Sequence, residues 1–276
     1  MNGIDPALAA ERCAEFVRST MEATGHKSLV VGLSGGIDSA VAAGVAARAI
    51  GAENVRGVMM PYSTSSAASL TDAEAVARIL GMVVEKVEIT SMADVFLAEM
   101  NTEDRVRRGN IMARCRMIVL YDRSARDGSL VLGTGNRTEG LLGYTTMYGD
   151  NACALNPIGQ LYKTEIRALC SYLGLPDSVL TKAPSADLWE GQSDEDELGV
   201  TYAEVDRLLV HMVDEGLGGR QLTALGFAEE LVVRVQKRVR AMAFKRTSPP
   251  VCTFPGRVNP DQPAFGAPAD KDGGFH

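Results

Sequence analysis

Several features that define other classes of protein are missing from this 276-residue sequence. Its five cysteines are an odd number and include no C-x-x-C pair, which argues against a disulfide framework or a zinc knuckle. No apolar run approaches the roughly 20 residues that span a bilayer. The formal net charge is -7, whereas nucleic-acid binding depends on Lys and Arg that neutralise phosphates. We therefore expect no membrane and no nucleic acid among its partners.

The first residues carry Asp5 and Glu11 and lack the apolar segment of a signal peptide, which predicts a cytoplasmic protein. What is present is 46% hydrophobic and 23% charged residues, the composition of a globular chain large enough for a full α/β core. Small-molecule chemistry is the class of function that fits this composition best.

Short apolar runs alternate with helical patterns along most of the chain. Strands are expected in the apolar run that begins at Leu29 and at 55–61, 83–89 and 129–134. Helices are expected at 6–24, 39–50, 70–81, 109–127, 163–173, 201–213 and 228–244. Asp5 is a candidate cap for the first helix, and Thr71 with Glu74 has capping-box spacing in the third. The alternation indicates an α/β fold, a single domain with a parallel, Rossmann-like sheet covered by helices on both faces.

Two segments depart from this alternation. Residues 183–199 (APSADLWEGQSDEDELG) are polar, acidic and without periodicity, and connections of this length are usually functional or mobile. From residue 248 onward, proline and glycine dominate. We therefore expect one domain over 1–247 and a largely disordered tail over 248–276.

The sequence SGGIDS at 34–39 follows the first expected strand and precedes a helix. Gly35 and Gly36 allow the backbone to approach an anion, the helix start offers unpaired N–H groups, and Ser34 and Ser39 add hydroxyls. The loop has neither the lysine of a Walker A motif nor the pattern G-x-G-x-x-G. Asp38 would repel a phosphate unless a cation lies between them, which points to Mg²⁺. The alternative is an ordinary glycine-rich turn.

The strand at 129–134 also ends in small residues and continues into a polar turn, GNRTEG. In open parallel sheets the carboxyl ends of the strands share one edge, where ligands bind. The sequence therefore predicts a second binding loop beside the first.

The SGGxDS loop resembles that of ATP pyrophosphatases, which cleave ATP to AMP and pyrophosphate. Further motifs narrow the resemblance to the ammonia-dependent NAD synthetase family, over a range from the first helix to residue 250. They are GNIMARCRM (109–117), LVLGTGNRTEGLLGY (130–144), YGDNACALNPIGQLYKTEIRAL (148–169), APSADLWEGQSDEDELG (183–199) and FKRTSPP (244–250). The resemblance implies an adenine nucleotide alpha hydrolase-like fold and ATP-dependent amidation of deamido-NAD by ammonia through an acyl-adenylate.

The resemblance also implies the roles of individual residues. Asp38, Glu139 and Lys163 would be catalytic, with Asp38 and Glu139 on Mg²⁺, and Arg114 and Lys245 would contact the dinucleotide. Alternatives stay open: Glu139 as a solvated loop acid, and Arg114 as a solvated helix residue. The ATP-binding set would be Gly32, Leu33, Ser34, Gly35, Gly36, Ile37, Asp38, Ser39, Thr134, Lys163 and Ser185.

Some members of the family carry Lys, Asp and His at positions that here are Met147, Ala154 and Phe244. These departures leave open a related ATP-dependent amide ligase that acts on another carboxylate. A non-enzymatic nucleotide-binding module is a further alternative, although it would not need two carboxylates poised for magnesium. The expected co-substrates are ATP, deamido-NAD and ammonia, either free or supplied by a partner, because the residues before the first strand provide only one helix. A homodimer is implied by the resemblance.

Overall fold

The structure is a computed structural model that describes residues 4–183, 199–252 and 254–256. The chain divides into two units, Met1–Arg246 and Thr247–His276, and the fold below is that of the first. The tail predicted at 248–276 lies largely outside the described residues.

The strands form one parallel sheet, in which β1 (Leu29–Gly32) lies at the centre. Its neighbours are β2 (Val55–Met59) and β4 (Leu130–Val131), and β3 (Val83–Lys86) pairs with β2. The order is therefore β3-β2-β1-β4. Because the chain leaves β1 toward β2 on one side and returns to β4 on the other, the strand order reverses beside β1, where α/β sheets bind ligands.

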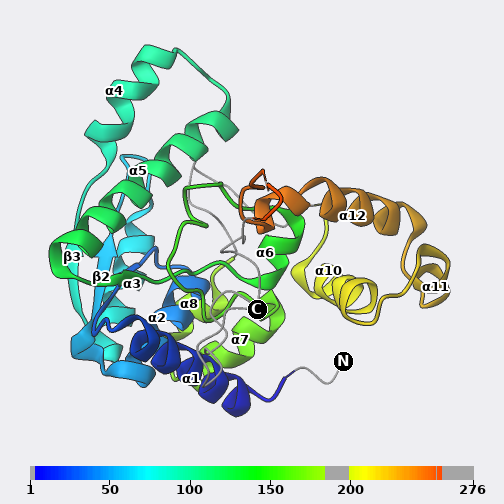
Figure 1. Ribbon diagram of the computed structural model, residues 1–276, viewed down its shortest axis with the longest axis horizontal. Coiled ribbons are helices and arrows are strands. Elements are labelled where there is room, and N and C mark those ends of the chain that lie inside the picture. Colours follow the sequence, from blue (N-terminus) through cyan, green and yellow to red (C-terminus); the bar gives the residue numbers. More distant parts are fainter. Residues whose placement is uncertain (1–3, 184–198, 253, 257–276) are drawn as a thin grey trace. The chain divides into compact units, whose positions relative to one another are not determined.

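Helices cover both faces of the sheet, which confirms the predicted architecture (Figure 1). On β1, Leu29 and Val31 face the core formed with α1, α2, α3 and α7, whereas Val30 faces α4 and α5. The helices are α1 (Pro6–Thr24), α2 (Ile37–Ile50), α3 (Ala67–Leu80), α4 (Thr90–Met100), α5 (Arg105–Asp127), α6 (Arg137–Leu142), α7 (Lys163–Tyr172), α8 (Asp177–Thr181), α10 (Tyr202–Leu209), α11 (Gly219–Ala224) and α12 (Glu229–Ala241).

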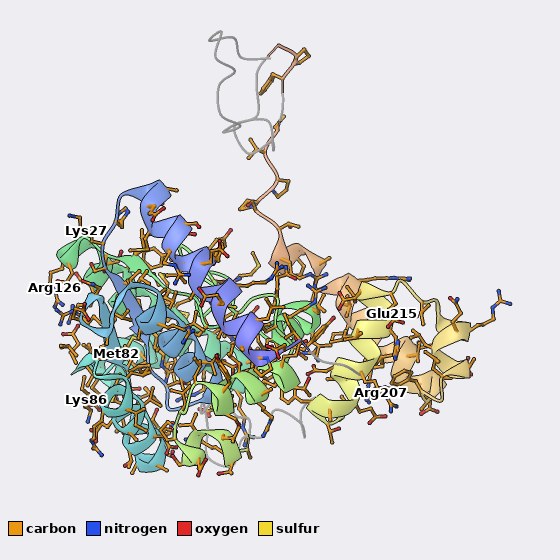
Figure 2. The ribbon with its side chains drawn as sticks, turned by 90° about the horizontal axis from the view of Figure 1, so that it is seen from below. Lys27, Met82, Lys86, Arg126, Arg207 and Glu215 are labelled. Carbon is orange, nitrogen blue, oxygen red and sulfur yellow. The ribbon has the colours of Figure 1, made fainter. Side chains whose placement is uncertain are left out.

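A separate apolar core joins α10, α11 and α12 to α6. Its buried members include Leu142 of α6 and Tyr162, which precedes α7. Figure 2 labels Arg207 and Glu215 in this helical group, apart from Lys86 at the sheet. The group matters for the site because α10 packs against both α6 and α7.

Several predicted boundaries hold and others need correction. The helix at 6–24 is present as predicted, and Asp5 caps it by accepting from the Leu8 amide at 2.8 Å. The prediction of a Thr71–Glu74 capping box is wrong, because α3 begins earlier and Ser66 caps it. The expected turn GNRTEG is instead the helix α6. Within the described ranges no helix combines the length and apolarity needed to cross a bilayer.

Candidate active site

The SGGIDS loop closes on itself through its two serines. The Ser34 and Ser39 hydroxyls lie 3.2 Å apart, and the Ser39 hydroxyl donates to the Gly36 carbonyl at 2.9 Å. The Gly36 amide donates to the Ser34 hydroxyl at 3.2 Å. Helix α2 begins directly after Gly36, so the unpaired N–H groups of its first turn face this loop. The loop therefore has the features of a phosphate cradle.

Gly35 is required at its position for two reasons. Its φ is +75°, a conformation that side-chain-bearing residues rarely adopt. A Cβ atom there would also lie 2.1 Å from the carbonyl oxygen of Ser69. Because Ser69 belongs to the first turn of α3, the absence of a side chain at Gly35 lets the start of α3 approach the phosphate loop closely.

Three of the predicted residues meet at the carboxyl edge of the sheet. The ammonium of Lys163 donates to Asp38 Oδ2 at 2.5 Å and to Glu139 Oε1 at 3.2 Å. Each residue comes from a different helix: Asp38 from α2, Glu139 from α6 and Lys163 from α7. The two predicted metal-binding carboxylates therefore face a common positive charge beside the phosphate loop.

Glu139 is not the solvated loop acid that the sequence left open. It is the third residue of α6 and forms a capping box with Asn136, whose side chain accepts from the Glu139 amide at 2.9 Å. Burial, together with the nearby charge of Asp38, raises the pKa of Glu139 to about 7, and Lys163 opposes this rise. A carboxyl group in this setting is stabilised as an anion by any additional cation.

Lys163 is buried, with 4% of its side chain exposed. Its backbone amide donates to the Thr138 hydroxyl at 3.0 Å, and its ammonium lies 5.2 Å from the centre of the Tyr202 ring. An ammonium so placed cannot turn away into solvent. Its position at the first turn of a helix, unfavourable to the dipole, is compensated by the two carboxylates it contacts.

A cavity of about 350 Å³ adjoins the cluster formed by Asp38, Glu139 and Lys163. Asn136 belongs to both, because it lines the cavity and its amide also donates to Asp38 Oδ1 at 2.8 Å. Lys245 lines the cavity as well and donates to the carbonyls of Gly143 and Thr145 at 2.8 and 2.7 Å. Burial lowers the pKa of Lys245. The cavity therefore presents a cation and several polar groups to a ligand.

The other predicted residues are more scattered. Arg114 lies on α5, exposed, and donates to the Met147 carbonyl at 3.2 Å. Thr134 lies between β4 and α6, half-buried. Phe244 is 56% exposed. Ser185, with most of the 183–199 segment, lies outside the described residues.

Sequence reasoning missed two polar residues that shape the cluster, Asn136 and Asp206. Asn136 could have been found, because Asn followed three positions later by Glu is a capping-box pattern. Asp206 gives no such signal: it is one acid in the amphipathic pattern of α10, and only the fold places it beneath α6 and α7.

Within the described residues, no group of three or more His, Cys, Asp or Glu side chains is arranged to hold a metal. Asp38 and Glu139 are two carboxylates only. Mg²⁺ is commonly held by one or two carboxylates plus phosphate oxygens and water, so the donor set fits an ion that arrives with a nucleotide.

The parallel sheet and its SGGxDS loop define the class, an adenine nucleotide alpha hydrolase-like α/β protein. A family model described as NAD synthase matches residues 9–249. The chain belongs to the NAD synthase family.

Similar proteins support this assignment across almost the whole length. An "NH(3)-dependent NAD(+) synthetase" of Chlorobium phaeovibrioides is 50% identical over 251 residues, 91% of each chain. The structure resembles an NH3-dependent NAD synthetase from Campylobacter jejuni, with a TM-score of 0.77 and 34% identity, covering 91% of this chain and 100% of that one. It also resembles an NMN synthetase from Francisella tularensis, with a TM-score of 0.81, 30% identity and the same coverage.

Proposed function

We propose that this protein amidates the nicotinate carboxylate of deamido-NAD, using ATP and ammonia and releasing AMP and pyrophosphate. The observation that carries the proposal is the convergence of Asp38 and Glu139 on the Lys163 ammonium beside the SGGIDS loop. A simple nucleotide-binding module has no use for two half-buried carboxylates at this place. The 50% identity to a named synthetase supports the same activity.

The chemistry requires activation of the acceptor, because oxide is a poor leaving group. The substrate carboxylate attacks the α-phosphate of ATP, forming an acyl-adenylate and breaking the bond to the β-phosphate. Pyrophosphate leaves into the loop, where the Ser34 and Ser39 hydroxyls and the first N–H groups of α2 stabilise its charge. Ammonia then attacks the acyl carbon, AMP departs, and the nitrogen loses a proton to solvent.

Lys163 supplies positive charge during the first step. Its ammonium is held by Asp38 and Glu139, so little reorganisation is needed when negative charge develops on the leaving phosphates. We assign Asp38 and Glu139 as the Mg²⁺ ligands. When bound, the ion would neutralise phosphate oxygens. No side-chain nucleophile is needed, so positioning and electrostatics carry the reaction.

The acceptor is assigned to the cavity beside the cluster. It lies next to Asn136, so a ligand there reaches the Asp38 side of the site, and Lys245 lines it with a positive charge suited to a substrate phosphate. Arg114 is the second predicted contact, reaching the 144–151 stretch through the Met147 carbonyl.

A second acceptor is favoured by one observation, the similarity to a protein called NMN synthetase. The name of that protein gives a mononucleotide as its product. Because this chain has Met147, Ala154 and Phe244 where some members of the family carry Lys, Asp and His, we expect its acceptor contacts to differ from theirs. Nicotinic acid mononucleotide is therefore the competing substrate.

One assay distinguishes the two proposed acceptors. The purified protein is given ATP, Mg²⁺ and ammonium with either deamido-NAD or nicotinic acid mononucleotide, and AMP, NAD and the amidated mononucleotide are quantified. We expect NAD and AMP in equal amounts, with kcat/KM for deamido-NAD at least about tenfold higher, equivalent to about 1.4 kcal/mol. Intact ATP, or AMP without amide, would contradict the proposal. Preference for the mononucleotide would establish the second acceptor.

We further propose a cytoplasmic homodimer. Exposed apolar side chains on α4 and α5 support self-association, namely Val95, Phe96, Val106 and Ile118. Light scattering on the purified protein measures the mass directly, and a monomer at the concentrations of the activity assay would contradict the dimer.

A further inference from the structure

We infer that Asp206 is a positioning residue for the reaction: it fixes the first turns of α6 and α7 against each other, so that Glu139 and Lys163 meet. This goes beyond the proposed function and rests on it only for the kinetic readout. Asp206 touches none of the groups that would contact ATP in the described structure. It acts through the backbone of the two helices that carry them.

The geometry joins three helices at one carboxylate. Oδ1 of Asp206 accepts from the Thr138 hydroxyl at 2.6 Å, and Oδ2 accepts from the Thr164 amide at 2.8 Å. The Thr138 hydroxyl in turn accepts from the Lys163 amide at 3.0 Å. Thr138 immediately precedes Glu139, so a single chain of hydrogen bonds connects the backbone positions of Glu139 and Lys163.

The contacts satisfy two backbone amides at the start of α7. Lys163 and Thr164 are the first two residues of α7, and the first four amides of a helix have no acceptor within it. The carboxylate of Asp206 lies at the positive end of α7 and beside the second residue of α6. Asp206 therefore caps one helix from a third, 42 residues away from Thr164.

The burial of Asp206 is costly by itself. Its relative exposure is 0%, and its neighbours on α10, Val205 and Leu209, are fully buried apolar side chains. Burial raises the pKa of Asp206, and only its hydrogen bonds oppose this. The hydrogen bonds of this buried carboxylate go to the first turns of α6 and α7. Its burial is therefore explained by those two contacts and not by an interaction with solvent.

Asparagine cannot replace this carboxylate in both contacts. The Thr138 hydroxyl has one proton, which it gives to Asp206, and its oxygen already accepts from Lys163. The side-chain amide of an asparagine offers a single acceptor atom. If that atom accepts from the Thr164 amide, the NH₂ group can donate to the second lone pair of the Thr138 hydroxyl, but the Thr138 proton then loses its acceptor. If it accepts from Thr138 instead, the Thr164 amide faces an NH₂ group. The opposite end of α6 stays fixed, because Arg238 and Arg246 donate to the carbonyls of Leu142 and Leu141 at 2.8 and 3.0 Å. The substitution therefore frees only the end that carries Glu139.

The test compares Asp206→Asn, Thr138→Val and Thr138→Ser with Leu209→Ala as the matched control. Leu209→Ala opens a cavity in the same helix but leaves the hydrogen bonds of Asp206 to Thr138 and Thr164 in place. At a temperature where all variants are folded by circular dichroism, we expect kcat to fall about 100-fold in Asp206→Asn and Thr138→Val, the scale of a 1 Å misplacement. Thr138→Ser keeps the hydroxyl and is expected to stay within about threefold of wild type, as is Leu209→Ala.

Two readouts do not depend on turnover. Hydrogen exchange of the Lys163 and Thr164 amides is expected to quicken in Asp206→Asn and to stay slow in Leu209→Ala. The affinity for ATP with Mg²⁺, measured by calorimetric titration, is expected to fall about tenfold in Asp206→Asn. If wild type makes no NAD, the proposed function fails, and the hydrogen exchange of the Lys163 and Thr164 amides still tests Asp206. Normal amide protection, or equal kcat in Thr138→Val and Leu209→Ala, would overturn the inference; should Asp206→Asn not fold, the Thr138 pair decides it.

Discussion

Replacing Gly35 by alanine tests whether the phosphate loop depends on its contact with α3. The added Cβ would lie 2.1 Å from the Ser69 carbonyl oxygen, whereas real Cβ contacts stay beyond 3.0 Å, so backbone on one side must move. The φ of +75° adds about 1–2 kcal/mol for a residue with a side chain. Overpacking typically costs about 1–3 kcal/mol. We therefore expect Gly35→Ala to lower the free energy of unfolding by about 2–5 kcal/mol.

Gly36→Ala is the matched control for this substitution. Gly36 has φ of -92°, and its Cβ would meet only the Ser34 hydroxyl, at 3.2 Å. Chemical denaturation followed by circular dichroism gives both free energies, and calorimetric titration gives the affinity for ATP with Mg²⁺. We expect Gly35→Ala to lose more in both measurements. Equal stability and equal ATP affinity in the two variants would refute the reasoning from Ser69.

Three further predictions concern the charges around the site. Asp38→Asn is expected to lower kcat at least about 100-fold while the circular dichroism spectrum is unchanged; normal turnover would remove Asp38 from the site. Lys163→Met is expected to lower kcat by a similar factor, measured against Lys27→Met at an exposed position, and equal kcat in the two would contradict the charge role of Lys163. For Asp206, whose folded-state pKa is raised, the stability it contributes is fully present below the unfolded pKa of about 3.9 and is lost as pH rises through the folded pKa. The stability advantage of wild type over Asp206→Asn should therefore shrink from acid toward neutral pH in denaturant titrations, and an advantage that grew with pH would show that burial does not dominate.

The fold was largely predictable because its signals are local. β-Branched runs and helical periodicity gave the four strands and most of the helices, and alternation gave the parallel sheet. The helix α6 was missed because six residues are too few to show a period. Its capping pair, Asn136 and Glu139, was the available signal. At α3 the opposite happened: Thr71 and Glu74 have capping spacing, but Ser66 starts the helix earlier.

The site was predictable only for residues that carry a motif or a resemblance. Lys163 lies 125 positions after Asp38 and 24 positions after Glu139. The structure nevertheless places both carboxylates within hydrogen-bonding distance of the Lys163 ammonium. Asn136 and Asp206 also help to form the site, through hydrogen bonds to Asp38 and Thr138. No phosphate-binding motif in the sequence includes either residue. Their roles depend on tertiary contacts that a local pattern does not encode.

The charges at the site explain why side chains from other elements contact both ends of α6. Its start is held by Asp206 through Thr138, and its end by Arg238 and Arg246. A helix of six residues has little stability of its own, since isolated helices shorter than about 12 residues are marginal in water. Glu139 must nevertheless stay beside Asp38 although the two carboxylates repel each other. The Lys163 ammonium, which donates to both carboxylates, and the contacts at both ends of α6 oppose that repulsion. The geometry of the site therefore depends on α10, α12 and the Ala243–Arg246 segment as well as on the phosphate loop.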